Sequence, residues 1–126
     1  MDKQMNIAVQ KTLIAIGMPH NLKGYTYVIS AIEKCLDDRN KINGITKGLY
    51  VEIATENGDT PSSVERVIRH AIEVSWEKGN SAVINKMFGY TISNKKGKPT
   101  NSEFIAYLTD FISLHLEEIV NEDYKW

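Results

Sequence analysis

A short turn between two stretches of helical periodicity constrains the fold more than any other feature of the chain. Residues 56–59 read Glu-Asn-Gly-Asp, a combination that favours a tight turn. Apolar residues recur at three- and four-residue spacing both before and after this turn. These apolar positions are Ile45, Leu49, Ile53 and Ala54 on one side and Val64, Val67, Ile68, Ala71 and Val74 on the other. The pattern predicts a helix–turn–helix whose second helix runs from about Ser62 to about Lys78.

Two residues compete for the N-cap of this second helix. The Thr60 hydroxyl can accept an unpaired backbone N–H while Pro61 occupies the first helical position. Ser62 and Glu65 form a competing capping box. Both alternatives start a helix here, and the sequence leaves open which residue is the cap.

Four further helical patterns complete the chain. They are expected at residues 7–16, 25–38, 81–88 and 104–119, and a capping box from Thr100 to Glu103 precedes the last of them. Residues 90–92 are expected to be extended and 93–99 to form a basic loop, and no convincing strand pair is present. The sequence therefore predicts an all-α fold of about six helices. We expect a single domain over residues 1–126, with tails at 1–6 and 117–126.

Composition limits the classes of protein to consider. With 126 residues, of which 42% are hydrophobic, the chain can close one core without metals or disulfides. Cys35 is the only cysteine, so no internal disulfide can form. No apolar run approaches the ~20 residues that a membrane span needs. We expect a cytoplasmic protein.

The charge balance argues against indiscriminate binding to polyanions. The formal net charge is -1 and the pI is about 6.3, whereas nucleic-acid-binding domains usually carry a basic excess. The only dense basic cluster is Lys95, Lys96 and Lys98, and residues 117–123 make the C-terminus acidic. Any contact with phosphates must therefore come from a local arrangement.

The predicted helix from Ser62 to Lys78 carries Glu65, Arg66 and Arg69 opposite its apolar face. Arginine can bond bidentately to guanine, and glutamate can accept from the cytosine amino group. A serine hydroxyl at the helix N-terminus can fix a phosphate. The same residues can form an ordinary solvated face with a Glu65–Arg69 ion pair at i,i+4. Periodicity alone favours the solvated face and leaves DNA reading open.

No catalytic or metal-binding pattern is present in the sequence. His20, His70 and His115 are far apart and Cys35 is isolated, so no metal-ligand spacing occurs. The stretch Gly97-Lys98-Pro99-Thr100 lacks the upstream glycine and the Ser or Thr of a phosphate loop. We therefore expect no enzyme activity, no metal and no cofactor.

The run from Val64 to Val74 closely resembles the recognition helix of a known family, the effector domains of the sporulation response regulator called stage zero sporulation protein A. Motifs on both sides extend the resemblance from about Ile14 to about Leu116. These motifs include Lys23-Gly24-Tyr25, Phe88-Gly89-Tyr90-Thr91 and the run from Lys98 to Ala106. The resemblance implies a six-helix effector domain of a bacterial transcription regulator that is nucleoid-associated when bound.

This resemblance also implies a set of contacts to double-stranded DNA. The recognition helix would enter the major groove of a TGTCGAA-like promoter box, with two domains on tandem boxes, and Glu65, Arg66 and Arg69 would contact bases. Phosphate contacts are expected from Ser62, His70, Lys95, Lys96 and Lys98. Ser63 stands where the family usually has arginine, so one cationic contact is missing.

In the same family, the segment matching residues 79–92 is implicated in contact with the housekeeping sigma factor of RNA polymerase. The residues that match are Gly79, Asn80, Phe88 and Tyr90. The middle, from Ser81 to Met87, diverges, and we interpret Val83, Ile84 and Met87 as core. The alternative function is a stand-alone protein-interaction module that modulates RNA polymerase or a full-length regulator without sequence-specific DNA binding.

The family's regulators normally carry a phosphoacceptor receiver domain before this region. About a dozen residues precede the first family-like helix here, too few for a domain. We therefore expect no receiver domain and no phosphorylation switch in this chain. Whether it is a fragment or a natural short protein stays open, although Met1 and the unfamiliar tail favour the latter. The sequence names neither the target genes nor the direction of regulation.

Overall fold

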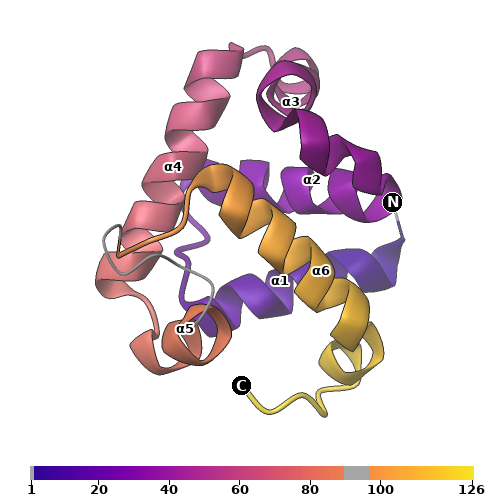
Figure 1. Cartoon of the computed structure of the whole chain (residues 1–126), viewed down its shortest axis with the longest axis vertical. Helices are drawn as coiled ribbons and strands as arrows, with labels where there is room; N and C mark the ends of the chain where they lie inside the picture. The colour runs from indigo at the N-terminus through magenta and orange to yellow at the C-terminus, as the bar shows by residue number, and fades with distance from the viewer. Residues whose placement is uncertain (1, 90–96) are drawn as a thin grey trace.

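The described part of the protein, residues 2–89 and 97–126 of a computed structural model, consists of six α-helices and two shorter helical turns (Figure 1). In chain order they are α1 (Lys3–Ile16), α2 (Lys23–Asp37), the 3₁₀ turn η1 (Arg39–Gly44), the π turn η2 (Ile45–Leu49), α3 (Tyr50–Asn57), α4 (Pro61–Lys78), α5 (Ser81–Phe88) and α6 (Asn101–Val120). These residues contain no strand, which confirms the predicted all-α fold. None of these helices is long and apolar enough to cross a membrane.

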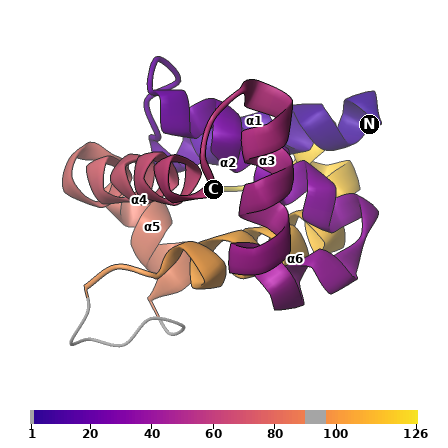
Figure 2. The same cartoon turned by 90° about the horizontal axis from the view of Figure 1, so that it is seen from above.

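One hydrophobic core holds the helices together. α2 packs against both α4 and α6, and α6 crosses α1 (Figure 1). Every α-helix contributes at least one large side chain that is almost fully buried. Together with Leu49 of η2, these side chains are Leu13, Ile16, Ile32, Ile53, Ile68, Ile72, Phe88, Phe104, Ile105, Leu108 and Ile112. Figure 1 places α3 and the start of α4 at one end of the molecule and α5 at the other, and Figure 2 looks along this direction with α3 toward the viewer.

Both ends of the chain are more helical than the sequence indicates. α1 already begins at Lys3, because the Asp2 carboxylate accepts the N–H of Gln4 at 2.8 Å and caps the helix. α6 continues to Val120, so only the last six residues follow it. These residues fold back, and the Tyr124 ring packs edge-on against Phe111 at a centroid distance of 5.2 Å. The tails expected at 1–6 and 117–126 are thus partly helical.

The segment before α3 differs from the helical pattern expected from Ile45 onward. Ile45–Leu49 forms a π turn, closed by a hydrogen bond from the Tyr50 N–H to the Ile45 carbonyl, and regular α geometry starts at Tyr50. Ile45, Leu49 and Ile53 are nonetheless all buried. Apolar spacing therefore predicts the buried face, but it does not distinguish an α turn from the slightly wider π turn.

Candidate nucleic-acid interface

The second helix of the helix–turn–helix, α4, has a well-defined start. Thr60 Oγ1 accepts the N–H of Ser63 at 3.2 Å, and Pro61 occupies the first helical position. Gly58 ends α3 with φ +62°, a left-handed conformation that glycine adopts without steric cost. The structure thus decides between the two competing caps in favour of Thr60, and Ser62 is left exposed in the first turn.

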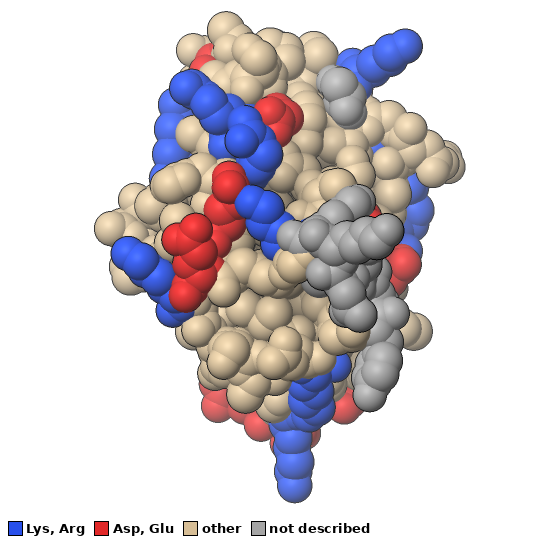
Figure 3. All heavy atoms as spheres, turned by 60° about the vertical axis from the view of Figure 1, so that its left-hand side comes forward, with Lys and Arg blue, Asp and Glu red and all other residues tan. Residues whose placement is uncertain are grey.

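α4 separates an apolar face from a polar one. Its buried residues, which face α2 and α3, are Val64, Ile68, Ala71, Ile72 and Ser75. The exposed or half-buried polar residues on its other side are Ser62, Glu65, Arg66, Arg69, His70 and Glu73. Figure 3 brings the side that carries α4 forward and shows basic and acidic side chains interleaved there. The outward face is therefore highly charged without being uniformly basic.

The two arginines on this face have different surroundings. Arg69 Nε donates to Glu65 Oε2 at 2.9 Å, and Arg69 Nη1 lies 3.9 Å from Glu73 Oε1. The hydrogen bond with Glu65 raises the pKa of Arg69. Arg66 is exposed and forms no side-chain hydrogen bond or ion pair within residues 2–89 and 97–126. Among the described residues, Arg66 therefore presents a guanidinium without a partner, whereas Arg69 is held by its neighbours.

Lys98 connects the segment before α6 to α4. Its Nζ lies 2.7 Å from Glu73 Oε2, and this hydrogen bond is the main reason that the pKa of Glu73 is lowered. Glu65, Arg69, Glu73 and Lys98 thus form a row of alternating charge that is neutral overall. The row shows how α4 can carry DNA-reading residue types in a chain with no basic excess.

The side chain of Asn101 ties the start of α6 to the helix–turn–helix. Its Nδ2 donates to the Tyr50 hydroxyl and to the Glu65 backbone carbonyl, each at 3.0 Å. The predicted capping box is present in the same turn, where the Glu103 N–H donates to Thr100 Oγ1 and the Thr100 N–H donates to Glu103 Oε1. Sequence reasoning missed the Asn101 contacts, because their partners lie 51 and 36 residues away.

Replacing Asn101 by alanine is expected to destabilise the domain by about 1–3 kcal/mol, because the buried Tyr50 hydroxyl loses a hydrogen-bond partner. Chemical denaturation monitored by circular dichroism measures the change. The neighbouring Ser102 is exposed, so Ser102→Ala serves as the control and should stay within about 0.5 kcal/mol of the parent. Equal stability of the two variants would show that the Asn101 contacts do not hold α6 in place.

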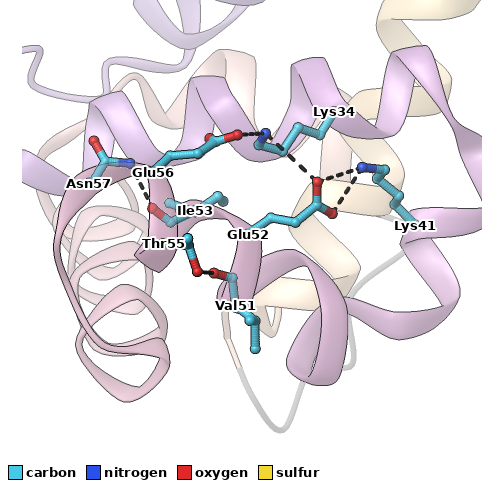
Figure 4. A network of polar contacts seen from close by, with 8 residues as sticks. All are labelled: Lys34, Lys41, Val51, Glu52, Ile53, Thr55, Glu56 and Asn57. Carbon is cyan, nitrogen blue, oxygen red and sulfur yellow. Dashed lines mark hydrogen bonds and ion pairs between the residues drawn. The ribbon is translucent and has the colours of Figure 1, made fainter.

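Ion pairs hold α3, the first helix of the helix–turn–helix, against α2 and η1. Lys34 Nζ lies 2.6 Å from Glu56 Oε2 and 3.9 Å from Glu52 Oε1. Lys41 Nζ lies 2.7 and 2.9 Å from the two carboxylate oxygens of Glu52 (Figure 4). A network of several charges is more effective than an isolated exposed pair. These contacts therefore help to fix the helix that precedes the turn.

The fold and the capped, outward-facing α4 agree with one known family. The family model described as "Sporulation initiation factor Spo0A C terminal" matches residues 9–112, which run from α1 into α6 and include the whole helix–turn–helix. The chain belongs to this family. The Spo0A C-terminal domain is the DNA-binding effector domain of a sporulation regulator, and its family is one of transcription-regulatory domains rather than enzymes.

In this member of the family, most of the predicted DNA contacts lie together on one helix face. These are Ser62, Glu65, Arg66, Arg69 and His70 on α4. Lys98 joins them through its ion pair with Glu73. Lys95 and Lys96 lie outside the described residues.

Part of the segment expected to contact a sigma factor belongs to the core of this domain. The Phe88 side chain is 2% exposed and its ring stacks parallel to that of Phe104 at 5.7 Å. Phe88 is therefore part of the core, and its expected contact with a sigma factor stays a prediction that its burial does not favour. Val83, Ile84 and Met87 are buried, as the sequence predicts.

Gly79 and Asn80 form the junction between α4 and α5. The Asn80 side chain accepts the N–H of Val83 at 3.2 Å and caps α5, while its backbone N–H donates to the Ile16 carbonyl at 2.8 Å. Asn80 is exposed and Gly79 is half-buried. The expected partner contact at Tyr90 lies outside the described residues.

The histidines and the cysteine do not converge on a site in the described part of the chain. No group of three or more His, Cys, Asp or Glu side chains there can hold a metal ion. Cys35 is fully buried in α2, and burial raises the pKa of its thiol to about 11. The thiol is therefore neutral at physiological pH and packs as a small apolar group.

Proposed function

We propose that this domain reads a TGTCGAA-like promoter box by placing α4 in the major groove, with Arg66 as the principal base-reading side chain. The observation that carries the proposal is the guanidinium of Arg66, which is exposed near the N-terminal end of a capped helix and has no side-chain partner among the described residues. In a helix–turn–helix, the N-terminal residues of the second helix contact base edges. Arginine there can donate two hydrogen bonds to guanine O6 and N7.

Glu65 and Arg69 act as a coupled pair in this proposal. Their ion pair occupies Arg69 in the free domain. When DNA is bound, Arg69 exchanges the Glu65 carboxylate for a guanine, and the released Glu65 accepts from a cytosine amino group. An exposed i,i+4 ion pair contributes little to stability, so the exchange costs little.

The phosphate contacts surround this reading centre. They are proposed for Ser62, His70, Lys95, Lys96 and Lys98. Ser62 lies in the first turn of α4, where backbone N–H groups lack helical partners and favour anions. Lys98 is already paired with Glu73, so it should contribute less than an unpaired lysine.

We also propose that two copies occupy tandem boxes and that the sigma factor of RNA polymerase is contacted beside Gly79 and Asn80. The exposed residues of the adjoining helix α5 are Ser81, Ala82, Asn85 and Lys86. α5 lies at the end of the molecule opposite the turn (Figure 1). A sigma contact at α5 therefore leaves the start of α4 free for DNA.

A mobility-shift titration tests the reading of a specific box. The domain is titrated against a duplex containing TGTCGAA and against a scrambled duplex, at two salt concentrations. We expect the box to be bound at least about tenfold more tightly, with both affinities falling as salt rises. Equal affinities for the two sequences would contradict the proposal and would favour the protein-interaction module.

A further inference from the structure

The turn before α4 contains an acidic residue, Asp59, whose side chain contacts another helix as well as the turn. Asp59 Oδ1 accepts the Thr60 N–H at 2.8 Å, a local bond that supports the cap. Asp59 Oδ2 faces α2, where it accepts the Tyr27 hydroxyl at 2.8 Å and lies 3.1 Å from Lys23 Nζ. The carboxylate side chain is only 14% exposed. One carboxylate therefore bonds both to the helix cap and to a different helix.

α2 contacts α4 at a second point, two turns further along. A Cβ built on Gly24 would lie 2.1 Å from the Val67 carbonyl oxygen and 2.7 Å from Ala71 Cβ. Only the absence of a side chain at Gly24 allows this close approach. Residues 60 and 67 of a helix are about 10 Å apart at 1.5 Å per residue. The first turn of α2 thus holds α4 at two separated points, Asp59 at its start and Val67 in its middle.

The residues proposed to read DNA lie along α4 between the Asp59 contact and the Gly24 contact, or beside the Gly24 contact. Ser62, Glu65 and Arg66 follow the Asp59 contact and precede the Gly24 contact, and Arg69 lies beside it. Two fixed points set both the position and the direction of a helix axis. Bidentate recognition needs the reading side chains to be held within about 0.5 Å and 10–20° of the productive geometry.

We infer that Asp59, with Tyr27 and Lys23, is a positioning device that sets the angle at which α4 is presented to DNA. The inference rests on the proposed reading of a box by α4. Asp59 and its partners do not touch DNA in this scheme. They act through α4, and their effect is on the discrimination between sequences rather than on phosphate attraction.

Two variants remove the contact in different ways. Asp59→Asn keeps Oδ1 for the Thr60 N–H but replaces the acceptor facing Tyr27 and Lys23 by an amide that only donates. Tyr27→Phe removes the hydroxyl alone and keeps the ring, which is 3% exposed and packs in the core. Asp110→Asn is the control for charge, because it changes the net charge equally at an exposed ion pair with Arg39. Val9→Ala is the control for stability, because Val9 is buried in α1.

The test compares the affinity for the box with the affinity for scrambled DNA, at a temperature where circular dichroism shows all variants folded. We expect Asp59→Asn and Tyr27→Phe to lower this affinity ratio at least threefold, while Asp110→Asn and Val9→Ala leave it unchanged. An unchanged ratio in both Asp59→Asn and Tyr27→Phe would overturn the inference and leave Asp59 with a stabilising role only.

Hydrogen exchange gives a second readout that does not depend on DNA. The Ser63 and Val64 amides donate to Thr60 at the start of α4. If the contact of Asp59 with Tyr27 and Lys23 fixes the first turn of α4, these amides exchange faster in Asp59→Asn and Tyr27→Phe than in Val9→Ala. The exchange rates of the variants are compared at equal global stability. Equal exchange rates would overturn the positioning role. If the parent protein shows no preference for the box over scrambled DNA, the proposed function is wrong. Hydrogen exchange would then still decide whether Asp59 positions α4.

Discussion

Replacing Arg66 by alanine is expected to weaken binding to the TGTCGAA box by about 1–3 kcal/mol, which corresponds to roughly 5- to 150-fold in affinity. The reason is that Arg66 has a free guanidinium on the outward face of α4, with no side-chain partner in the described part of the chain to be displaced first. Loss of a bidentate contact to guanine should relax discrimination at one base pair. Binding to scrambled DNA should weaken less, because only a general attraction to phosphates is reduced.

The control for this variant lies on the same helix. Lys78 is an exposed cation in the last turn of α4, and Lys78→Ala removes the same charge far from the N-terminal end of the helix. Fluorescence anisotropy with labelled box and scrambled duplexes measures both variants. If Arg66→Ala and Lys78→Ala weaken the two duplexes alike, Arg66 contributes only charge and the assignment of base reading is wrong.

Replacing Gly24 by alanine is expected to destabilise the domain by about 2 kcal/mol or more. Gly24 is the second residue of α2, and a change from glycine to alanine in a helix ordinarily stabilises by up to about 1 kcal/mol, so the expected sign is reversed. The added Cβ would lie 2.1 Å from the Val67 carbonyl oxygen, and because this oxygen belongs to the backbone, α4 must move away from α2.

Gly48 provides the control, because a Cβ added there meets no atom within 4 Å. Urea denaturation of Gly24→Ala, Gly48→Ala and the parent compares the free energies of unfolding. We expect Gly48→Ala to unfold at a midpoint close to that of the parent and Gly24→Ala at a clearly lower one. Similar midpoints for the two variants would show that α2 and α4 have room to separate.

Features encoded in a few adjacent residues could be predicted from the sequence. The turn at Asn57-Gly58-Asp59 and the capping box from Thr100 to Glu103 each depend on side chains within three residues of one another. The buried face of α4 follows from its helical periodicity. These local signals were sufficient for the all-α fold and for the position of the helix–turn–helix.

The sequence could not decide between a solvated face and a DNA-reading face for α4, and the structure shows why. The Glu65–Arg69 ion pair expected of a solvated face is present. Arg66, which follows Glu65 and lies about one turn before Arg69, is exposed. The same helix face therefore satisfies both interpretations. Family membership, rather than periodicity, establishes DNA binding.

Contacts between distant parts of the chain could not be predicted. Glu73 with Lys98, Tyr27 with Asp59, and Asn101 with Tyr50 are separated by 25, 32 and 51 residues. Nothing in the local sequence specifies such pairs, because they depend on how the helices pack. The burial of Phe88 was missed for the same reason, since its ring packs on Phe104 from a different helix.

The most direct test of base reading by Arg66 is a double-mutant cycle between the protein and the DNA. Each guanine of the box is replaced in turn by 7-deazaguanine, which lacks the N7 acceptor, and each duplex is titrated with the parent and with Arg66→Ala. If Arg66 bonds one guanine, the parent loses affinity at that guanine, whereas Arg66→Ala shows little further loss there. Losses that add at every guanine would show that Arg66 contacts none of them, and would contradict the proposed reading of the box by α4.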